Sequence, residues 1–251
     1  MRHWRRQRGL SQLDLALEAN VSQRHLSFVE SGRSVPSRRL LLVLADVLNV
    51  PLRERNTLFL AAGYAPAYKE PKSEDPSLAV VMNAIDQMMA NHEPHPALLM
   101  DRYWNVLRTN QAAPRVFGSL IDLQAWPTPR NLPEMIFDPA GLRPYVENWP
   151  AVASGLLQRL RRESLGQVLD DKTRALLGKL RSFPGVDELK PTLESESAVL
   201  PITFVKGDTR WSYFSLITTV GTPQSVTAQE LRLECMYPAD HLAAATQNAH
   251  A

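Results

Sequence analysis

Residues 10–37, LSQLDLALEANVSQRHLSFVESGRSVPS, place a Ser-Gln pair at the start of two consecutive segments with helical apolar spacing. Ser11 is a favourable N-cap, and Asp14, three residues later, can complete a variant of the capping box. Ser22 caps the second segment in the same way. Asn20, between the two, tolerates the left-handed backbone that a tight turn needs. The stretch therefore predicts two short helices joined by a tight turn.

Helix signals continue on both sides of this pair. Residues 2–8 read as a basic helix, Ser37 caps a helix over residues 38–48, and Pro51 precedes a helix that ends before Gly63. The apolar positions of the two central helices fall where the helices must face each other: Leu10, Leu15, Ala16, Val21, Leu26 and Val29. The sequence thus predicts an all-α N-terminal domain of five short helices over residues 1–63.

The charge of the chain is unevenly distributed. Residues 1–70 carry 11 Lys/Arg and 6 Asp/Glu, a net +5, whereas residues 71–251 carry 17 and 20, a net −3. A basic segment attached to a mildly acidic body indicates that the first part meets a polyanion, provided that motif and fold agree.

Two helices joined by a tight turn inside a small basic bundle describe a helix-turn-helix. At the first helix, Gln12 is placed to add a hydrogen bond to a DNA phosphate at the helix N-terminus. At the second helix, Gln23 is expected to read adenine and Arg24 guanine in the major groove. Further expected contacts to phosphate or base edges come from Ser22 and Ser27, and contacts to the passing backbone from Arg33 and Ser37.

On these residues the segment resembles the xenobiotic-response-element (Cro/C1-type) helix-turn-helix family, over roughly residues 1–63. The resemblance implies a phosphate contact at Gln12 and major-groove contacts at Gln23, Arg24 and Ser27. Members usually carry several residues before the position of Met1, so the first helix is expected to be incomplete. Phe28 occupies a groove-facing position that is often polar, and two interpretations stay open: contact with a thymine methyl group, or packing against another part of the protein.

The rest of the chain divides by composition. Residues 64–77 contain three prolines in a charged context and read as a linker. Residues 78–92 have helical spacing, residues 96–110 read as two short strands around a polar turn, and a mainly helical region spans about 111–182. A hairpin turning at residues 206–208 and a last strand follow. This order predicts an α+β domain over residues 78–251, with a small antiparallel sheet covered by helices on one face.

The segments HPALLMDRYWNVLRTNQAAPRVFG and LPITFVKGDTRWSYFSLITTVGTPQSVTAQELRLECMYP resemble the MmyB-like ligand-binding domain, which is PAS-like. The resemblance covers about residues 95–240 and implies an apolar pocket, with fatty acids as suspected ligands in some members. Pocket candidates are Tyr103, Trp104, Asn105, Asn110, Trp211, Tyr213 and Phe214. The alternative for each is a core aromatic or a turn-forming asparagine.

Several other functions are disfavoured. The chain has one cysteine and no apolar run long enough for a membrane span, and its basic N-terminus lacks the apolar stretch of a secretory signal, so the expected location is the cytoplasm. Catalytic and phosphate-loop motifs are missing, so no enzyme activity is expected, and neither a metal nor another cofactor. The basic face at residues 159–162 is expected to be solvated or paired with Glu163. Leu13 and Leu17 are expected to pack on the fifth helix rather than to dock the second domain.

The combined expectation is a DNA-binding transcription regulator whose C-terminal domain senses a small, apolar ligand. One recognition helix reads few base pairs, so a homodimer on a palindromic site is predicted. A second hypothesis keeps the DNA binding but gives the C-terminal domain a role in dimerisation or partner docking alone.

Overall fold

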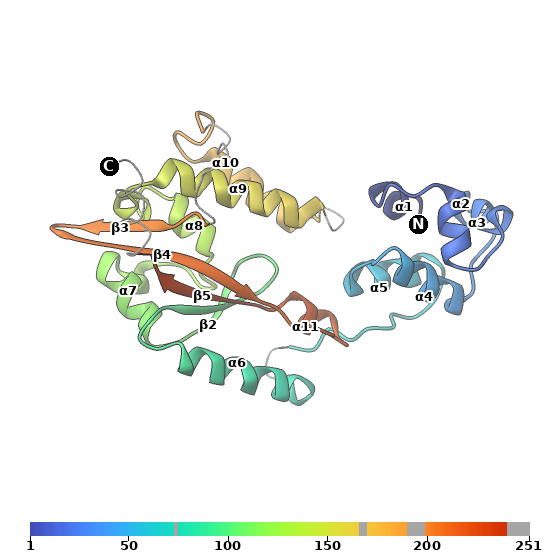
Figure 1. Cartoon of the computed structure of the whole chain (residues 1–251), viewed down its shortest axis with the longest axis horizontal. Helices are drawn as coiled ribbons and strands as arrows, with labels where there is room; N and C mark the ends of the chain where they lie inside the picture. The colour runs from blue at the N-terminus through green and yellow to red at the C-terminus, as the bar shows by residue number, and fades with distance from the viewer. Residues whose placement is uncertain (73–74, 166–169, 190–198, 240–251) are drawn as a thin grey trace, which may run out of the picture. The chain divides into compact units, whose positions relative to one another are not determined.

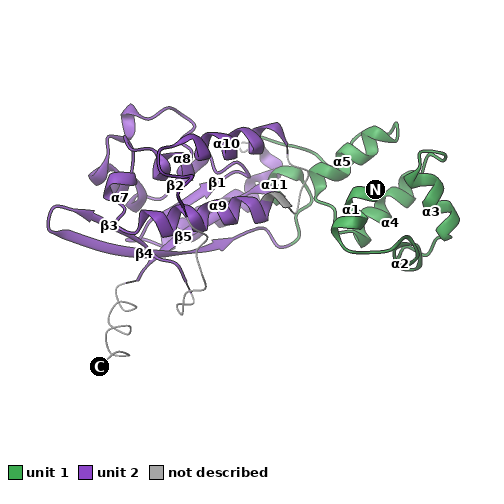
Figure 2. Ribbon diagram, turned by 90° about the horizontal axis from the view of Figure 1, so that it is seen from above, with its two compact units in different colours: residues 1–73, 222–229 green, residues 74–221, 230–251 purple. Residues whose placement is uncertain are grey.

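The computed structural model describes residues 1–72, 75–165, 170–189 and 199–239. The chain divides into two compact units, shown in separate colours in Figure 2. The first comprises Met1–Ser73 and Thr222–Gln229, and the second comprises Glu74–Gly221 and Glu230–Ala251. A short segment late in the sequence therefore belongs to the N-terminal unit.

The first unit is helical, as predicted. Its N-terminal part contains α1 (Arg2–Gln7), α2 (Gln12–Glu18), α3 (Gln23–Glu30), α4 (Arg38–Val47) and α5 (Leu52–Ala61). The core gathers apolar side chains from α2, α3 and α4, and Leu15, Leu44 and Leu48 have no exposed surface. The five predicted helices are thus confirmed.

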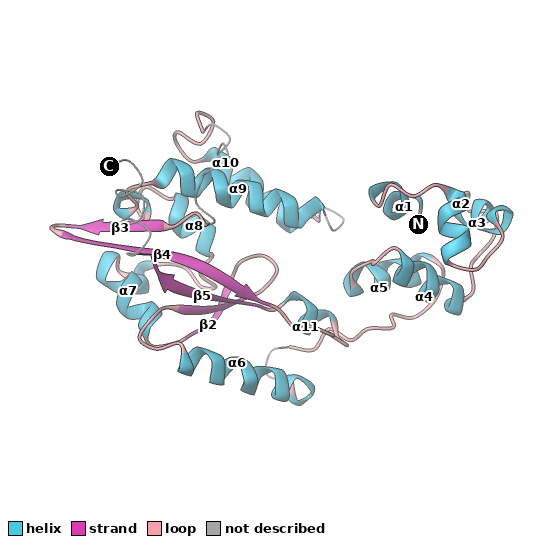
Figure 3. Cartoon of the chain, viewed as in Figure 1, coloured by secondary structure: helices cyan, strands magenta, loops and turns pink. Residues whose placement is uncertain are grey.

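The second unit contains an antiparallel sheet (Figure 3). Its strands are β1 (Ala97–Met100), β2 (Val106–Thr109), β3 (Ile202–Lys206), β4 (Thr209–Thr218) and β5 (Arg232–Pro238), in the order β2-β1-β5-β4-β3. The β3–β4 hairpin turns at Gly207, whose positive φ of 56° suits a tight turn. The predicted hairpin and the predicted last strand are confirmed.

Helices surround this sheet on both faces. They are η1 (Pro76–Leu78), α6 (Ala79–Asn91), α7 (Ala112–Leu120), η2 (Leu123–Ala125), α8 (Leu132–Phe137), η3 (Arg143–Tyr145), α9 (Trp149–Leu165) and α10 (Asp171–Ser182). All four residues of β1 are buried, although successive strand residues point to opposite faces. Leu98 and Met100 join the main core with α7, α8 and α9, and α6 lies against the other face (Figure 1). The prediction of helices on one face is therefore wrong, because the apolar stripe of α6 covers the second face.

One helix was not foreseen from the sequence. The connection between β4 and β5 contains α11 (Val226–Glu230), most of which belongs to the first unit. Within that unit, Val226 N–H donates to the carbonyl of Lys69 at 2.9 Å, and Thr227 Oγ1 donates to the carbonyl of Pro71 at 2.6 Å. The side chain of Gln229 accepts the N–H of Leu52 at the start of α5, at 2.7 Å. This β4–β5 connection thus helps to build the N-terminal unit.

Candidate nucleic-acid interface and ligand cavity

The α2–turn–α3 segment is fixed by local hydrogen bonds. Ser11 Oγ accepts Asp14 N–H at 3.1 Å and Asp14 Oδ2 accepts Ser11 N–H at 2.9 Å, which completes the capping box. Ser22 Oγ accepts the N–H of His25 at 3.2 Å, and Asn20 has a φ of 53°. The predicted caps and turn are confirmed, and they set the start of α3.

A small residue lets α2 and α3 approach closely. Ala16 in α2 is 1% exposed, as is Leu26 in α3, and Leu15 beside it has no exposed surface. Protein interiors are packed as densely as organic crystals, so a side chain larger than that of Ala16 would have little room at this contact. The angle between the two helices is therefore set by their buried faces, while their N-termini stay at the surface.

A buried polar network ties α1, α2 and α3 together. Arg5 donates from Nε and Nη2 to the two oxygens of Glu30, each at 2.8 Å, and Gln12 Nε2 donates to Glu30 Oε2 at 2.8 Å. The side chain of Glu30 has no exposed surface. Burial raises the pKa of Glu30, but the hydrogen bonds from Arg5 and Gln12 and the arginine charges outweigh it and lower the pKa overall.

This network determines how Gln12 can act. A primary amide has two N–H hydrogens. Glu30 accepts one of them and so orients the side chain of Gln12. A phosphate contact at Gln12 would use the second hydrogen, with the amide already fixed in place.

The predicted groove-reading residues lie on the surface of α3 and just beyond it. Ser22, Gln23, Arg24, Arg33 and Ser37 are exposed, and Ser27 and Phe28 are half-buried. The hydroxyls of Ser22 and Ser37 accept backbone N–H groups as helix caps. The guanidinium of Arg24 lies 5.5 Å from the ring centre of Phe28. Phe28 therefore contacts the arginine expected to read guanine, an arrangement typical of a cation–π pair.

Leu13 and Leu17 do not pack as expected. Leu13 is 50% exposed and Leu17 is 71% exposed. The prediction that they pack on the fifth helix is wrong, since α2 buries Leu15 and Ala16 and turns the other two leucines toward solvent.

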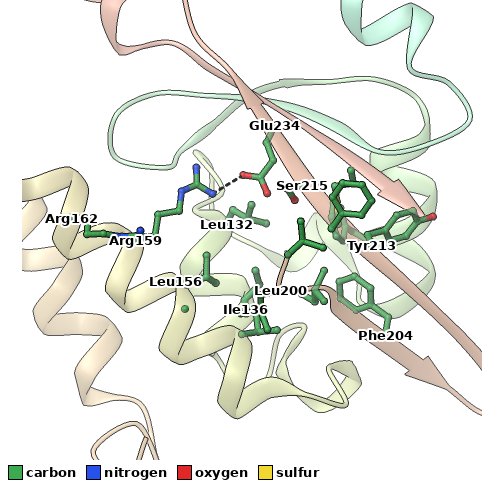
Figure 4. A pocket seen from close by; sticks show the side chains of 17 residues that line it. Leu132, Ile136, Leu156, Arg159, Arg162, Leu200, Phe204, Tyr213, Ser215 and Glu234 are labelled. Atoms are coloured by element: carbon green, nitrogen blue, oxygen red, sulfur yellow. Dashed lines mark ion pairs between the residues drawn. The ribbon is translucent and has the colours of Figure 1, made fainter. Parts of the chain in front are cut away.

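The second unit contains a cavity of about 390 Å³ between the sheet and helices α7, α8 and α9 (Figure 4). Its walls are mostly apolar side chains: Phe117, Leu132, Ile136, Val152, Leu156, Val199, Leu200, Ile202, Phe204, Tyr213, Phe214 and Met236. Gly155, on α9, also lines it. The volume and the apolar lining are typical of sites for small molecules.

The structure brings two of the predicted ligand residues, Tyr213 and Phe214, to this cavity, both from β4. Tyr103 and Asn105 line a separate, more open depression beside α10. Trp211 packs against the core, with its ring centre 6.2 Å from that of Phe204.

The remaining two predicted ligand residues lie in the framework. Asn110 is buried, and its side chain accepts the N–H of Ala97 at 3.0 Å and donates to the carbonyl of His95 at 2.7 Å. Trp104 is 1% exposed and has a φ of 66°, in the left-handed region that a bulky residue rarely adopts. The Asp101 side chain holds this turn by accepting the N–H groups of Tyr103 and Asn105, at 2.8 and 3.0 Å. A strained residue held in this way is often found near a functional site.

The sequence reasoning missed the polar end of the cavity. Arg159, on α9, and Glu234, on β5, both line it, and their closest side-chain N and O atoms are 3.6 Å apart. Figure 4 shows the guanidinium of Arg159 directed toward the carboxylate of Glu234. The predicted pairing of this basic face with Glu163 is confirmed, because Arg159 Nε donates to Glu163 at 3.0 Å. The available signal was Glu234 itself, the acid of β5, which stands between the apolar residues Leu233 and Cys235.

Family comparison agrees with this arrangement of two units. The family described as "MmyB-like transcription regulator ligand binding domain" matches residues 81–249, which is more than half of the chain. The chain belongs to this family. A second family, described as "Helix-turn-helix", matches residues 1–55. The resemblances inferred from the sequence are therefore confirmed for both units.

Membership gives the coarse function of each unit. The first unit of this MmyB-like regulator is a DNA-binding helix-turn-helix, and the second is a ligand-binding domain for a small molecule. Both are domains of a transcription regulator. Among the described residues, none of the helices combines the length and the apolar character that a membrane span requires.

Other comparisons add little. No curated protein matches the chain of this MmyB-like regulator. Among solved structures, the chain is similar to "Structure of an RNA-binding Light-Oxygen-Voltage Receptor", with 13% identity and a TM-score of 0.30. The match covers 95% of this chain and 59% of that chain. So weak a likeness carries no argument about fold or function.

Proposed function

We propose that this regulator binds a palindromic operator as a homodimer, and that its C-terminal domain senses a small, apolar, fatty-acid-like ligand. In this proposal α3 enters the major groove, with Gln23 and Arg24 reading base edges and Ser27 and Phe28 beside them. Ser22, Arg33, Ser37 and Gln12 contact the backbone of the DNA.

The exposed N-terminal face of α3 supports the DNA part. Gln23 and Arg24 are exposed there, and the net charge of residues 1–70 is +5. A single recognition helix covers few base pairs, and most helix-turn-helix proteins therefore bind as dimers to half-sites about one DNA turn apart.

The single observation that carries the ligand part is the cavity of about 390 Å³ in the second unit. It lies between the sheet and α7, α8 and α9, its walls are mainly apolar, and a few polar groups gather at one end. An apolar body with one polar group fits such a site.

The β4–β5 connection offers a route from ligand to DNA-binding unit. Phe214 and Met236, on β4 and β5, line the cavity, and the segment joining these strands, Thr222–Gln229, belongs to the first unit. A ligand that binds one arrangement of β4 and β5 better than another would bias the position of this segment. DNA affinity would change accordingly.

DNA binding by variants tests the first part. With a selected operator, Arg24→Ala should weaken binding by about 1–3 kcal/mol and relax the sequence preference at one base position. Gln12→Ala should weaken all sequences to a similar extent. Arg174→Ala removes the same charge from an exposed position of the second unit and serves as the matched control. If neither α2 nor α3 variant differs from this control, the assigned orientation of the helix-turn-helix is wrong.

Native mass spectrometry followed by organic extraction tests the second part. A dimer that releases a small apolar compound, and whose DNA affinity shifts when that compound is added back, supports the proposal. A dimer that binds operator and responds to no such compound supports the alternative, in which the second unit only dimerises the protein or docks a partner. Turnover of the extracted compound would instead point to an enzyme.

A further inference from the structure

The polar end of the cavity contains a cation–carboxylate pair that is incompletely satisfied. Glu234 is 7% exposed, and Arg159 Nη1 lies 3.6 Å from Glu234 Oε2, beyond the usual hydrogen-bond distance. Arg159 Nη2 and Glu234 Oε2 are both buried and have no hydrogen-bond partner among the described residues. Buried polar atoms in native proteins are almost always paired, so such atoms beside a cavity indicate a missing partner.

The surroundings hold Arg159 at this position. Its Nε donates to Glu163 at 3.0 Å, and its guanidinium lies 4.1 Å from the ring centre of Trp104. Arg232 also pairs with Glu163. The backbone on either side of Trp104 is held in its turn by Asp101, which accepts the N–H groups of Tyr103 and Asn105. Arg159 is therefore positioned by partners outside the cavity, and its Nη2 is left for a further hydrogen bond.

The two unpaired atoms have opposite requirements. Arg159 Nη2 needs an acceptor, and Glu234 Oε2 needs a donor. An ionised carboxylate supplies acceptors alone, and it would also lie beside the negative charge of Glu234 at a buried site, where like charges repel strongly. A primary alcohol or amide supplies both an acceptor and a donor without a charge.

We infer that the cavity takes a long-chain amphiphile with an uncharged head that both accepts and donates hydrogen bonds, such as a primary alcohol or amide, in preference to a fatty-acid anion. The inference rests on the proposed ligand-sensing function and specifies the ligand class. Arg159 and Glu234 are the residues that determine this specificity. Arg162 also lines the cavity, but it is exposed, and solvent weakens its attraction for an anion.

A matched series of ligands tests the inference directly. Decan-1-ol, decanamide and sodium decanoate share one chain length and differ in the head group. Isothermal titration calorimetry of the full chain at pH 7.5, where an aliphatic carboxyl group with a pKa of about 4 is ionised, gives their affinities. The two neutral compounds should bind at least about tenfold more tightly than decanoate, as expected for one added hydrogen bond to a charged partner.

Glu234→Gln should remove or reverse this difference in affinity between the neutral compounds and decanoate. The variant removes the negative charge while keeping the size of the side chain, so decanoate should gain about tenfold in affinity. The neutral compounds should change little, because the glutamine side chain still accepts and donates. Glu147→Gln makes the same change at an exposed residue paired with Arg210, outside the cavity, and should leave the ranking as in the wild type.

The outcomes separate the two levels of the proposal. Decanoate binding at least as tightly as the neutral compounds overturns the head-group inference and leaves the apolar sensor intact, with Arg162 as the anchor. The head-group inference is also overturned if the wild type and Glu234→Gln show the same relative affinities for the three compounds. If none of the three compounds binds while operator DNA still does, both the inference and the ligand-sensing function fail. The wild-type ranking decides the matter even if Glu234→Gln does not fold.

Discussion

The two units bury a glutamate in contrasting ways. In the first, Glu30 accepts hydrogen bonds at 2.8 Å from Arg5 and Gln12, and α1, α2 and α3 meet at this carboxylate. In the second, Glu234 lies 3.6 Å from Arg159, and one buried oxygen of Glu234 has no hydrogen-bond partner within the part of the chain that the structure describes. A complete network holds a framework in one geometry, whereas an incomplete one beside a cavity can gain from a ligand. Glu30 therefore stabilises the fold, whereas Glu234 is available to bind a ligand.

The largest effect expected from this comparison is on stability. Glu30→Gln should destabilise the first unit by about 3 kcal/mol, because it leaves the charge of buried Arg5 without its partner. Glu234→Gln should change stability by less than about 1 kcal/mol, since Arg159 keeps Glu163 as a partner. Hydrogen exchange of amides in α3 and β5 measures each unit separately within the full chain.

Similar losses of stability in Glu30→Gln and Glu234→Gln would contradict this comparison. Glu234 would then be as much a part of the framework as Glu30. A loss confined to Glu234→Gln would reverse the two assignments.

Acid pH should weaken the Glu30 network. The pKa of Glu30 is lowered in the folded protein, so its contribution to stability is complete above the ordinary glutamate value of about 4.3 and is lost as the pH falls through the lower folded value. Amide exchange in α3 should therefore accelerate below about pH 4 in the wild type. The Glu30→Gln variant should lack this acid-induced acceleration of amide exchange. An identical acid response in both proteins would assign the acid sensitivity to other carboxyl groups.

A smaller effect is expected where the cavity meets α9. A Cβ at Gly155 would lie 2.7 Å from Leu200 Cδ2, so Gly155→Ala must push this side chain and narrow the cavity. Decan-1-ol affinity should fall severalfold, while the better helix propensity of alanine, up to about 1 kcal/mol, offsets the crowding. Calorimetry and thermal unfolding provide the two readouts.

Gly178→Ala is the matched control for this substitution. Gly178 lies in α10, and a Cβ there meets no atom of the described residues within 4 Å. It should stabilise the helix by up to about 1 kcal/mol and leave decan-1-ol binding unchanged. Equal ligand affinities in the two variants would mean that the ligand does not occupy the Gly155 end of the cavity.

The smallest effect concerns the segment that joins the units along the chain. Gln229→Ala removes the acceptor for Leu52 N–H at the start of α5, where Pro51 provides no side-chain cap. The first unit should lose about 1 kcal/mol. The ligand-dependent change in operator affinity should shrink more than the operator affinity itself. A ligand response equal to that of the wild type would show that the signal does not pass through this segment.

Features fixed by neighbouring residues were predictable. The capping box of Ser11 and Asp14, the cap at Ser22 and the left-handed turn at Asn20 each depend on atoms within a few residues. The β3–β4 hairpin at Gly207 has the same local origin. The sequence therefore indicated the helix-turn-helix, the hairpin strands and the exposed face of α3.

Features made by distant residues were not predictable in this way. The pairing of Arg159 with Glu234 joins a helix to a strand far along the chain, and the segment Thr222–Gln229 packs with the N-terminal unit. The aromatic residues around Trp104 had the composition of a pocket, yet Trp104 and Asn110 belong to the buried framework.

The sequence by itself determined the helices of the first unit, with their caps and the turn at Asn20, because short-range hydrogen bonds and apolar periodicity encode them locally. The tertiary structure alone decided where the cavity lies, which acid stays unsatisfied and which unit α11 joins. These depend on packing between segments that have no local preference for one another, and burial then gives a single charge such as that of Glu234 its importance.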